Sequence, residues 1–396
     1  MRKKTIRDVN VRGKRVLLRV DYNVPLDKET GAILDDSRIR ATLPTIEYLR
    51  EQGAKVIIVS HVGRPKGKRD PKLSLWPVAQ RLGELIGAPV HAPGECMGPI
   101  VRELAHSLEP GEVLMLENVR FHAEEEANDA DFAKALASLA EVYVNDAFGT
   151  AHRAHASTEG VARLLPAVAG LLMEKEIDFL GRAVANPEHP YAAIVGGAKV
   201  SSKMAVLDAL LERVDKLLIG GGMANTFLKA EGFEIGASLV EDDYVAKAHE
   251  VMEHASAKGV RLLLPTDVIV AERFEAESPY KRVSVKDVPA DWMIMDIGET
   301  SVEVFRKSLE NCKMVVWNGP MGVAEMKPFA HGSHRIAGAL AGLEATTIVG
   351  GGETAAIVSE LGLTAKFSHV STGGGASLEF LEGKELPGVA ALLDAE

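Results

Sequence analysis

The sequence predicts an α/β protein made of two doubly wound, Rossmann-like domains, each built on a mostly parallel sheet. Two observations predict this class. From Lys14 onward, short runs rich in Val, Ile and Leu alternate with longer amphipathic stretches, which is the pattern of repeated βα units. The chain is also 396 residues long. Because a single hydrophobic core rarely spans that length, we expect two domains.

In the first half, the apolar runs predict four strands and one clear helix. The strands are expected at residues 15–20, 55–60, 112–116 and 141–145. Residues 37–52 have an apolar face at helical spacing. The residues of that face are Ile39, Leu43, Ile46 and Leu49. Gly53 follows as a stop signal, so a helix is expected to end there.

The second half repeats the same alternation after a connecting helix. Strands are expected at residues 191–196, 216–220, 261–265, 292–297, 314–317, 346–350 and 367–371. Residues 173–186 read as a helix that Pro187 and Pro190 stop. We therefore expect a first domain over residues 1–172, a connecting helix over 173–187 and a second domain from residue 188.

Composition excludes several classes of protein. Lys and Arg number 45 against 56 Asp and Glu, a net charge of −11, which argues against general nucleic-acid binding. No apolar run reaches the roughly 18 residues of a membrane helix, and no apolar signal segment follows the basic start, so a cytoplasmic protein is expected. Cys96 and Cys312 form no CxxC pattern, so neither a disulfide framework nor a thiolate metal site is predicted.

Polar and cationic residues follow the predicted strands of the first half. They are Asp21 and Asn23, then His61 and Arg64, then Arg120, then Arg153, with Arg38 at the start of the first helix. A lone His or Arg at such a position is usually solvated surface, and Asp21 and Asn23 could equally be caps of the turn before Pro25. Together they would gather at one edge of a parallel sheet, where arginines suit phosphate and carboxylate groups. A metal site at His61, His152 and His155 is disfavoured, because the neighbouring arginines would repel a cation.

Glycine-rich turns follow the predicted strands of the second half. They are Gly196-Gly197, Gly220 to Gly222, Gly350 to Gly352 and Gly373 to Gly375. Such turns bring backbone amides and helix N-termini to a phosphate; Lys199 and Lys203 are expected one helical turn apart beside the first of them. The alternative is tight turns that need positive φ. Neither the P-loop pattern nor the dinucleotide GxGxxG fingerprint is present.

Seven motifs run in order through almost the whole chain. They are RVDYNVP from Arg19, SHVGRP from Ser60, ENVRFH from Glu117, NDAFGTAHRAH from Asn145, GGAKV from Gly196, WNGPMG from Trp317 and STGGGAS from Ser371. In this combination the sequence closely resembles the phosphoglycerate kinase family. The resemblance implies transfer of the acyl phosphate of 1,3-bisphosphoglycerate to Mg-ADP, giving 3-phosphoglycerate and ATP.

The resemblance also implies a role for each candidate site residue. The phosphoglycerate would be held by Asp21, Asn23, Arg38, His61, Arg64, Arg120 and Arg153. The nucleotide would be held by Lys203, Gly220, Gly221, Asn318, Glu325, Gly350, Gly351, Gly352 and Glu353. The residues expected at the transferred phosphoryl group are Arg38, Lys199, Lys203, Gly352 and Gly374. The family usually has Asp where this chain has Glu353, so the expected Mg²⁺ contact would come from a longer side chain.

The resemblance further implies a nucleotide domain over residues 188–380 and a tail over 381–396 that returns to the first domain. A monomer is also expected. A hinge is expected because arginines on one domain and glycine turns on the other act together only if the domains close. Two alternatives stay open. A nicotinamide-dependent oxidoreductase fits the fold class but lacks its fingerprint, and a non-catalytic anion-binding protein could retain the fold.

Overall fold

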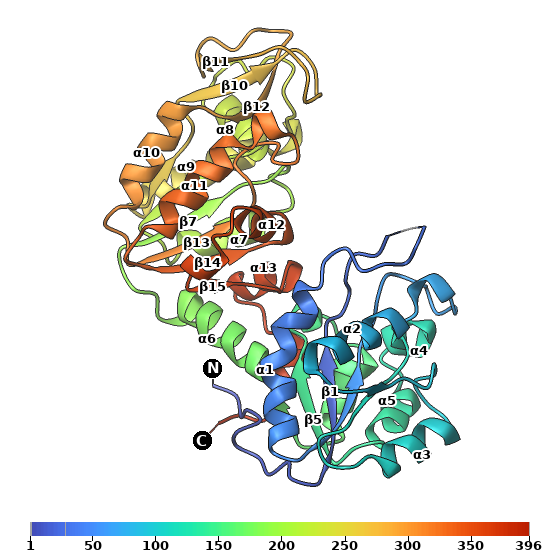
Figure 1. Ribbon diagram of the computed structural model, residues 1–396. Coiled ribbons are helices and arrows are strands. Elements are labelled where there is room, and N and C mark those ends of the chain that lie inside the picture. Colours follow the sequence, from blue (N-terminus) through green and yellow to red (C-terminus); the bar gives the residue numbers. More distant parts are fainter. Residues whose placement is uncertain (1, 28, 396) are drawn as a thin grey trace. The chain divides into compact units, whose positions relative to one another are not determined.

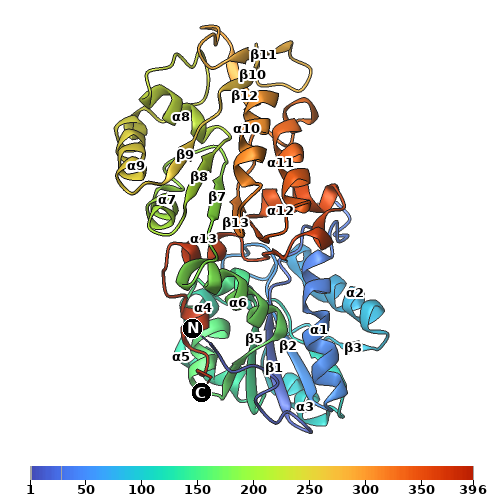
Figure 2. The ribbon, with the colours of Figure 1, turned by 90° about the vertical axis from the view of Figure 1, so that its left-hand side faces the viewer.

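The computed structural model describes residues 2–27 and 29–395 and divides into two compact units. Unit 1 runs up to Asp178 and resumes at Glu385, and unit 2 runs from Phe179 to Lys384. Each unit contains a six-stranded sheet of parallel strands with helices packed on it (Figures 1 and 2). The predicted α/β class with two parallel-sheet domains is confirmed.

The sheet of unit 1 has the strand order β3-β4-β2-β1-β5-β6. The strands are β1 (Arg15–Val20), β2 (Lys55–Val59), β3 (Val90–His91), β4 (Val113–Met115), β5 (Val142–Asp146) and β6 (Ala167–Ala169). All four strands expected in this half are present. The short β3 and β6 were not predicted, because runs of so few residues carry no clear periodicity.

The helices of unit 1 cover both faces of this sheet. They are α1 (Ser37–Glu51), α2 (Trp76–Ile86), α3 (Pro99–Ser107), α4 (Ala123–Glu126), α5 (Ala130–Ala137) and α14 (Pro387–Ala390). Figure 2 shows α1 and α2 on one side of the strands and α5 on the other. Ile39, Ile46 and Leu49 of α1 are fully buried against the sheet, as their spacing predicts, whereas Leu43 is only partly buried.

The sheet of unit 2 has the order β15-β14-β13-β7-β8-β9. The strands are β7 (Tyr191–Val195), β8 (Lys216–Ile219), β9 (Arg261–Leu263), β13 (Met314–Asn318), β14 (Thr346–Gly350) and β15 (His369–Val370). The helices are α7 (Met204–Leu211), α8 (Met223–Ala230), α9 (Val245–Ala257), α10 (Glu299–Leu309), α11 (His331–Ala341), α12 (Gly352–Glu360) and α13 (Gly375–Leu381). Figure 2 shows α7 to α9 on one side of the strands and α10 to α12 on the other.

A second, three-stranded antiparallel sheet belongs to unit 2. Its order is β11-β10-β12, with β10 (Asp267–Ala271), β11 (Tyr280–Ser284) and β12 (Met293–Ile297). Residues 292–297 were expected among the strands of the parallel sheet, which is wrong. The strand is present, but it pairs with β10, whose own pattern was not recognised.

The helix α6 (Leu171–Ala185) contains the division between the two units. It begins slightly before the predicted residue 173. Asp146, the last residue of β5, accepts hydrogen bonds at Oδ1 from the backbone N–H groups of Leu172 (2.9 Å) and Met173 (3.0 Å). The carboxyl group of Asp146 thus satisfies two of the amides that a helix start leaves unpaired.

The end of the chain packs on unit 1. The ammonium group of Lys3 donates to the carbonyl of Leu392 at 2.9 Å, and Asn145 Nδ2 donates to the carbonyl of Gly388 at 3.1 Å. The backbone of Gly388 also donates to Ala151 at 2.8 Å. Among the described residues, no helix combines the length and apolarity needed to cross a membrane.

Candidate functional site

The loops that follow four neighbouring parallel strands form the first candidate surface, which we call the cationic edge. It consists of Asp21 and Asn23 after β1, His61 and Arg64 after β2, Arg120 after β4, Arg153 after β5, and Arg38 on α1. The strands β4, β2, β1 and β5 lie side by side in that order. The carboxyl ends of parallel strands meet at one edge, so these side chains gather there as predicted.

Hydrogen bonds tie the loops of the cationic edge to one another. Arg38 NH1 pairs with Asp21 Oδ2. Asn23 Oδ1 accepts from the backbone N–H of Gly63 at 2.8 Å, and Arg120 NH1 donates to the carbonyl of Gly63 at 3.1 Å. Asp21 also accepts from the N–H of Asn23 at 3.2 Å. Asp21 therefore caps the turn, as one interpretation of the sequence predicted, and it also contacts Arg38.

Arg19, near the end of β1, was missed as a functional candidate. Its side chain is fully buried, and its Nε donates to Ser157 Oγ at 2.8 Å. Its NH2 lies 3.2 Å from His61 Nδ1. Ser157 Oγ in turn donates to the carboxylate of the fully buried Glu125 at 2.6 Å. The available signal was a charged residue inside an otherwise apolar strand, which is costly unless the charge is paired.

Burial, together with nearby arginines, keeps the imidazoles of His61 and His155 neutral at pH 7. Burial, followed by the charges of Arg19 and Arg120, lowers the pKa of His61 well below its usual value. Burial and the charge of Arg120 also lower the pKa of His155, to about 4. At neutral pH the positive charge therefore comes from guanidinium groups. Among the described residues, no group of three or more His, Cys, Asp or Glu side chains could hold a metal ion.

Two arginines of the cationic edge project toward solvent. Arg64 is exposed, and its guanidinium makes no hydrogen bond or ion pair with any residue of the described ranges. Arg153 is also exposed, and its guanidinium Nε lies 3.2 Å from Nε2 of the neighbouring His152. These two side chains have guanidinium donors available for an anionic ligand.

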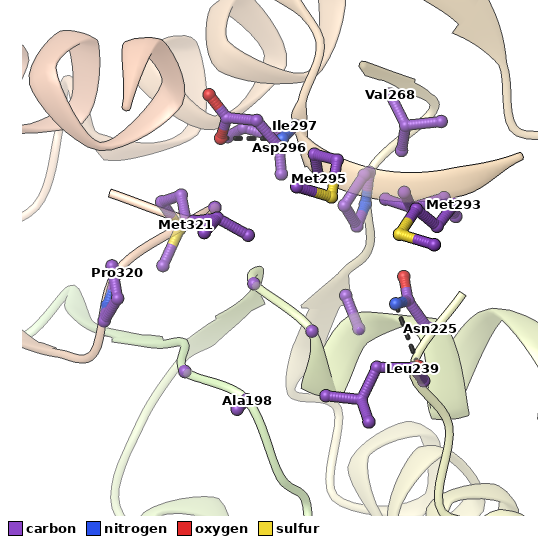
Figure 3. A pocket seen from close by; sticks show the side chains of 18 of the residues that line it. Ala198, Asn225, Leu239, Val268, Met293, Met295, Asp296, Ile297, Pro320 and Met321 are labelled. Carbon is purple, nitrogen blue, oxygen red and sulfur yellow. Dashed lines mark hydrogen bonds between the residues drawn. The ribbon is translucent and has the colours of Figure 1, made fainter. Parts of the chain in front are cut away.

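A cavity of about 420 Å³ in unit 2 is the second candidate surface (Figure 3). Its walls come from the turns after β7, β8 and β13, from α8 and from the small antiparallel sheet. Most of its lining is apolar or glycine, with Met293, Met295 and Met321 among the side chains drawn in Figure 3. A largely apolar cavity of this size suits a flat organic ring.

Glycines let three turns meet beside this cavity. The N–H of Gly197 donates to the carbonyl of Pro320 at 3.0 Å, and that of Gly221 donates to the carbonyl of Met321 at 2.9 Å. A Cβ on Gly221 would lie 2.6 Å from the nitrogen of Gly197, and one on Gly220 would lie 2.5 Å from Met321 Sδ. The close approach of the turns requires glycine at both positions, and Gly221 also lines the cavity.

A cationic group lies next to the glycine turn after β14. Lys203 Nζ pairs with Asn318 Oδ1 at the end of β13. Burial lowers the pKa of Lys203 to about 8, and the negative charge of Glu353 opposes this shift. Asn318 packs against Gly350, since a Cβ on Gly350 would lie 3.0 Å from Nδ2 of Asn318. The ammonium group, the Asn318 amide and the start of α12 thus form one polar cluster.

The other predicted residues of unit 2 are less closely packed. Gly352 begins α12, and a Cβ there would meet no atom within 4 Å. Gly351 and Gly374 precede α12 and α13 with φ of +90° and +52°, so the tight-turn reading also holds for them. Glu325 and Glu353 are exposed and line the cavity.

One prediction about this cluster is wrong. The segment that starts at Gly196 does not open directly into a helix, because α7 begins only at Met204 and Lys203 is its N-cap. Lys199 is exposed in the preceding turn. The two lysines are therefore not one helical turn apart, and only Lys203 is partly buried beside Asn318.

The residues present fit a magnesium ion carried by a nucleotide. Mg²⁺ prefers oxygen ligands and is usually held by one or two carboxylates together with substrate phosphates. Glu353 offers an exposed carboxylate in the first turn of α12, within electrostatic range of Lys203. A single protein carboxylate is enough for such a site, provided that phosphate oxygens complete the coordination.

Comparison with known proteins identifies the family. A model of the family described as phosphoglycerate kinase matches residues 6–384. The curated phosphoglycerate kinase of Moorella thermoacetica is 57% identical over 394 residues, and that of Pelotomaculum thermopropionicum is 56% identical over 394 residues, each match covering 100% of both chains.

Solved structures agree. Phosphoglycerate kinase from Coxiella burnetii superposes with a TM-score of 0.88 at 42% identity, and that from Pyrococcus horikoshii with a TM-score of 0.87 at 36% identity. Each comparison covers 98% of both chains. The chain belongs to the phosphoglycerate kinase family.

Proposed function

We propose that the cationic edge and the cavity of unit 2 together carry out the reaction of this family. As a member, the chain is a glycolytic kinase that reversibly transfers the acyl phosphate of 1,3-bisphosphoglycerate to ADP, giving 3-phosphoglycerate and ATP. The assignment of one reactant to each unit rests on one observation. Guanidinium groups gather after four parallel strands of unit 1.

In this proposal unit 1 binds the phosphoglycerate. The binding residues are Asp21, Asn23, Arg38, His61, Arg64, Arg120 and Arg153. Arg64 and Arg153 support this role because their guanidinium groups are exposed. Arg38 would lie at the reacting carboxyl group, where a guanidinium neutralises the charge shared between the carboxylate and the transferred phosphoryl group.

Unit 2 would bind the nucleotide. The base would enter the largely apolar cavity beside Gly220 and Gly221, and Glu325 would contact the ribose. The phosphates would lie by Lys203, Asn318 and the turn Gly350–Gly352, with Lys199 and Gly374 nearby. The N-terminus of α12 supports this placement, because helix amides attract phosphate. Glu353 would hold Mg²⁺, which would offset the charge of the phosphates when bound.

The chemistry asks little of the protein beyond positioning. An acyl phosphate is already activated, so no side chain has to become a nucleophile. The residues must align two anions, neutralise them and exclude water. Because each unit would hold one reactant, we also propose that hinge closure brings the reactants together. A monomer in the cytoplasm, without nucleic-acid or membrane partners, completes the proposal.

The test is a coupled spectrophotometric assay with 3-phosphoglycerate and Mg-ATP. Arg38→Ala should lower kcat by at least about 100-fold, with a smaller change in KM, because its charge matters most in the transition state. Arg40→Ala is the matched control on the same helix, since Arg40 is exposed and pairs with Asp36. It should keep kcat close to that of the parent.

Two results would contradict the proposal. If the parent protein bound both substrates without turnover, the proposed activity would be wrong. If the Arg38→Ala variant had the kcat of the parent, the role proposed for Arg38 would be wrong.

A further inference from the structure

Three fully buried polar side chains of unit 1 form a hydrogen-bonded network that ends at His61. The three are Glu125, Ser157 and Arg19, and we call them the buried network. Arg19 Nε lies 2.8 Å from Ser157 Oγ, which lies 2.6 Å from Glu125 Oε1. Arg19 NH2 lies 3.2 Å from Nδ1 of His61, a side chain of the cationic edge. The buried network thus connects a carboxyl group to the imidazole of His61.

The guanidinium group of Arg19 determines the direction of these hydrogen bonds, because it can donate but cannot accept. Ser157 Oγ must accept from Arg19 Nε, so its single proton is left to donate to Glu125. The backbone N–H of Ser157 also donates to Glu125 Oε2, at 2.9 Å. In the same way, His61 Nδ1 must accept from Arg19 NH2. Nδ1 therefore carries no proton.

A proton on Nδ1 of His61 would have no acceptor. It would face the N–H of Arg19, so two donors would meet in the interior of the protein. Asp21 Oδ1 lies 4.0 Å from Nδ1, which is too far for a hydrogen bond, and Asp21 pairs with Arg38 instead. Burial and the charges of Arg19 and Arg120 lower the pKa of His61, so the ring is neutral and has one proton. That proton lies on Nε2.

Nε2 of His61 remains open to a ligand. It makes no hydrogen bond with any residue of the described ranges, yet it is not one of the fully buried polar atoms that lack a partner. The 3% of the side chain that is exposed therefore includes Nε2. An N–H at this nitrogen can donate to an anionic oxygen, whereas the other tautomer would present a lone pair and repel it.

We propose that the buried network holds the proton of His61 on Nε2 and so makes this imidazole a hydrogen-bond donor to the phosphoglycerate. Arg19 acts on the ring directly. Ser157 and Glu125 act through Arg19, because they hold its Nε, and all three are positioning residues. Arg19 thus determines which nitrogen of His61 meets the anion. This inference rests on the phosphoglycerate site proposed for unit 1.

Nuclear magnetic resonance on the full chain, with ¹⁵N-labelled histidine, measures the position of the proton. The nitrogen chemical shifts distinguish a protonated from an unprotonated ring nitrogen, and the His61 signals are those missing from the spectrum of His61→Gln. In the parent at pH 7 we expect Nε2 to be protonated and Nδ1 to be unprotonated, with no second tautomer. This result does not depend on whether variants of the buried network fold.

Ser157→Ala tests the buried network without changing any charge. It removes the acceptor of Arg19 Nε, so Arg19 should hold Nδ1 of His61 less firmly and both tautomers should be populated. The two nitrogen shifts of His61 should then move toward each other. The KM for 3-phosphoglycerate should rise at least about 3-fold, and the KM for ATP should stay unchanged.

A matched control separates positioning from loss of structure. Ser138→Ala is the same substitution at an exposed position of unit 1, where the hydroxyl donates only to the carbonyl of Ala135. It should keep the His61 shifts and both KM values of the parent. A simple loss of folded protein would lower kcat and leave both KM values unchanged, so it cannot imitate the result expected for Ser157→Ala.

Two outcomes would overturn this inference and leave the proposed function standing, because turnover would be unaffected. They are a proton on Nδ1 of His61 in the parent, in whole or in part, and a Ser157→Ala variant with the shifts and KM of the parent. Separately, 3-phosphoglycerate should shift the Nε2 proton signal of His61 in the parent. If saturating 3-phosphoglycerate left that signal in place, the proposed phosphoglycerate site would be wrong at His61, and the role of the buried network would fall with it.

Discussion

Lys203 is the residue whose charge we expect to respond most directly to a bound nucleotide. Burial lowers its pKa to about 8, with Glu353 opposing the shift, so part of the free protein lacks this proton at pH 8. Phosphate groups placed beside the amine favour the charged form and raise its pKa. ADP binding at pH 8 should therefore take up a fraction of a proton.

Calorimetry in buffers of different ionisation enthalpy measures this uptake. Lys203→Arg is the control, because a guanidinium stays charged at pH 8 and has no proton to gain. The uptake should be lost in that variant. The same proton uptake in the parent and in Lys203→Arg would assign the titration to another group.

Substitutions of Glu353 test the proposed contact between its carboxylate and magnesium. Glu353→Asp should retain substantial activity with a changed magnesium dependence, because it keeps the carboxylate on a shorter side chain. Glu353→Gln keeps the size and removes the charge, so it should raise the half-saturating magnesium concentration more than Glu353→Asp does. The measurement is a magnesium titration at fixed ADP that records half-saturation and kcat. If Glu353→Gln matches the parent throughout, the carboxylate only favours the start of α12.

Individual site residues could be predicted only where they belong to a motif that is recognisable in the sequence. The exposed arginines Arg64 and Arg153 follow predicted strands, so the sequence indicated where they would lie. Arg19 was missed because its significance depends on a distant partner. Ser157, to which its Nε donates, is 138 positions away in the sequence.

At the scale of elements, we expect the three turns beside the cavity to depend on glycine for their close packing. Gly221 has φ of +67°, and a Cβ would lie 2.6 Å from the nitrogen of Gly197. Gly221→Ala should therefore lower the free energy of unfolding by about 2–4 kcal/mol, from left-handed strain and overpacking. It should also weaken ADP binding, because Gly221 lines the cavity.

Gly338→Ala is the matched control for this substitution. Gly338 lies inside α11, and a Cβ there meets no atom within 4 Å. Alanine should stabilise that helix by roughly 0.5–1 kcal/mol. Urea unfolding of both variants gives the comparison, and a Gly221→Ala variant as stable as the parent would contradict the close packing of the turns.

The elements that the sequence predicted wrongly are held by long-range contacts. The turn after Gly197 does not continue as a helix, because the N–H of Gly197 donates to the carbonyl of Pro320 and the carbonyl of Gly197 accepts from the N–H of Met223. In addition, Glu241 accepts hydrogen bonds from the N–H and Oγ of Ser201. Similarly, β12 joins β10 rather than the parallel sheet. Local periodicity predicts that a strand exists and leaves its partner undetermined.

At the scale of the whole molecule, the alternation of strands and helices was sufficient to predict two parallel sheets, because each βα unit is a local pattern repeated many times. The return of the C-terminal segment to unit 1 depends on contacts such as Lys3 with Leu392, which no local pattern encodes. The resemblance to a family supplied that expectation. The assignment of one substrate to each unit remains a prediction.

Hydrogen–deuterium exchange with mass spectrometry on the full chain tests that assignment most directly. The protein is compared free, with 3-phosphoglycerate alone and with ADP alone. We expect 3-phosphoglycerate to slow exchange in the loops of unit 1 that contain Asn23, His61, Arg120 and Arg153. We expect ADP to slow exchange in unit 2, in the turns at residues 196–203, 220–225, 318–325 and 350–354. Protection of the same unit by both ligands would contradict the division of the two reactants between unit 1 and unit 2.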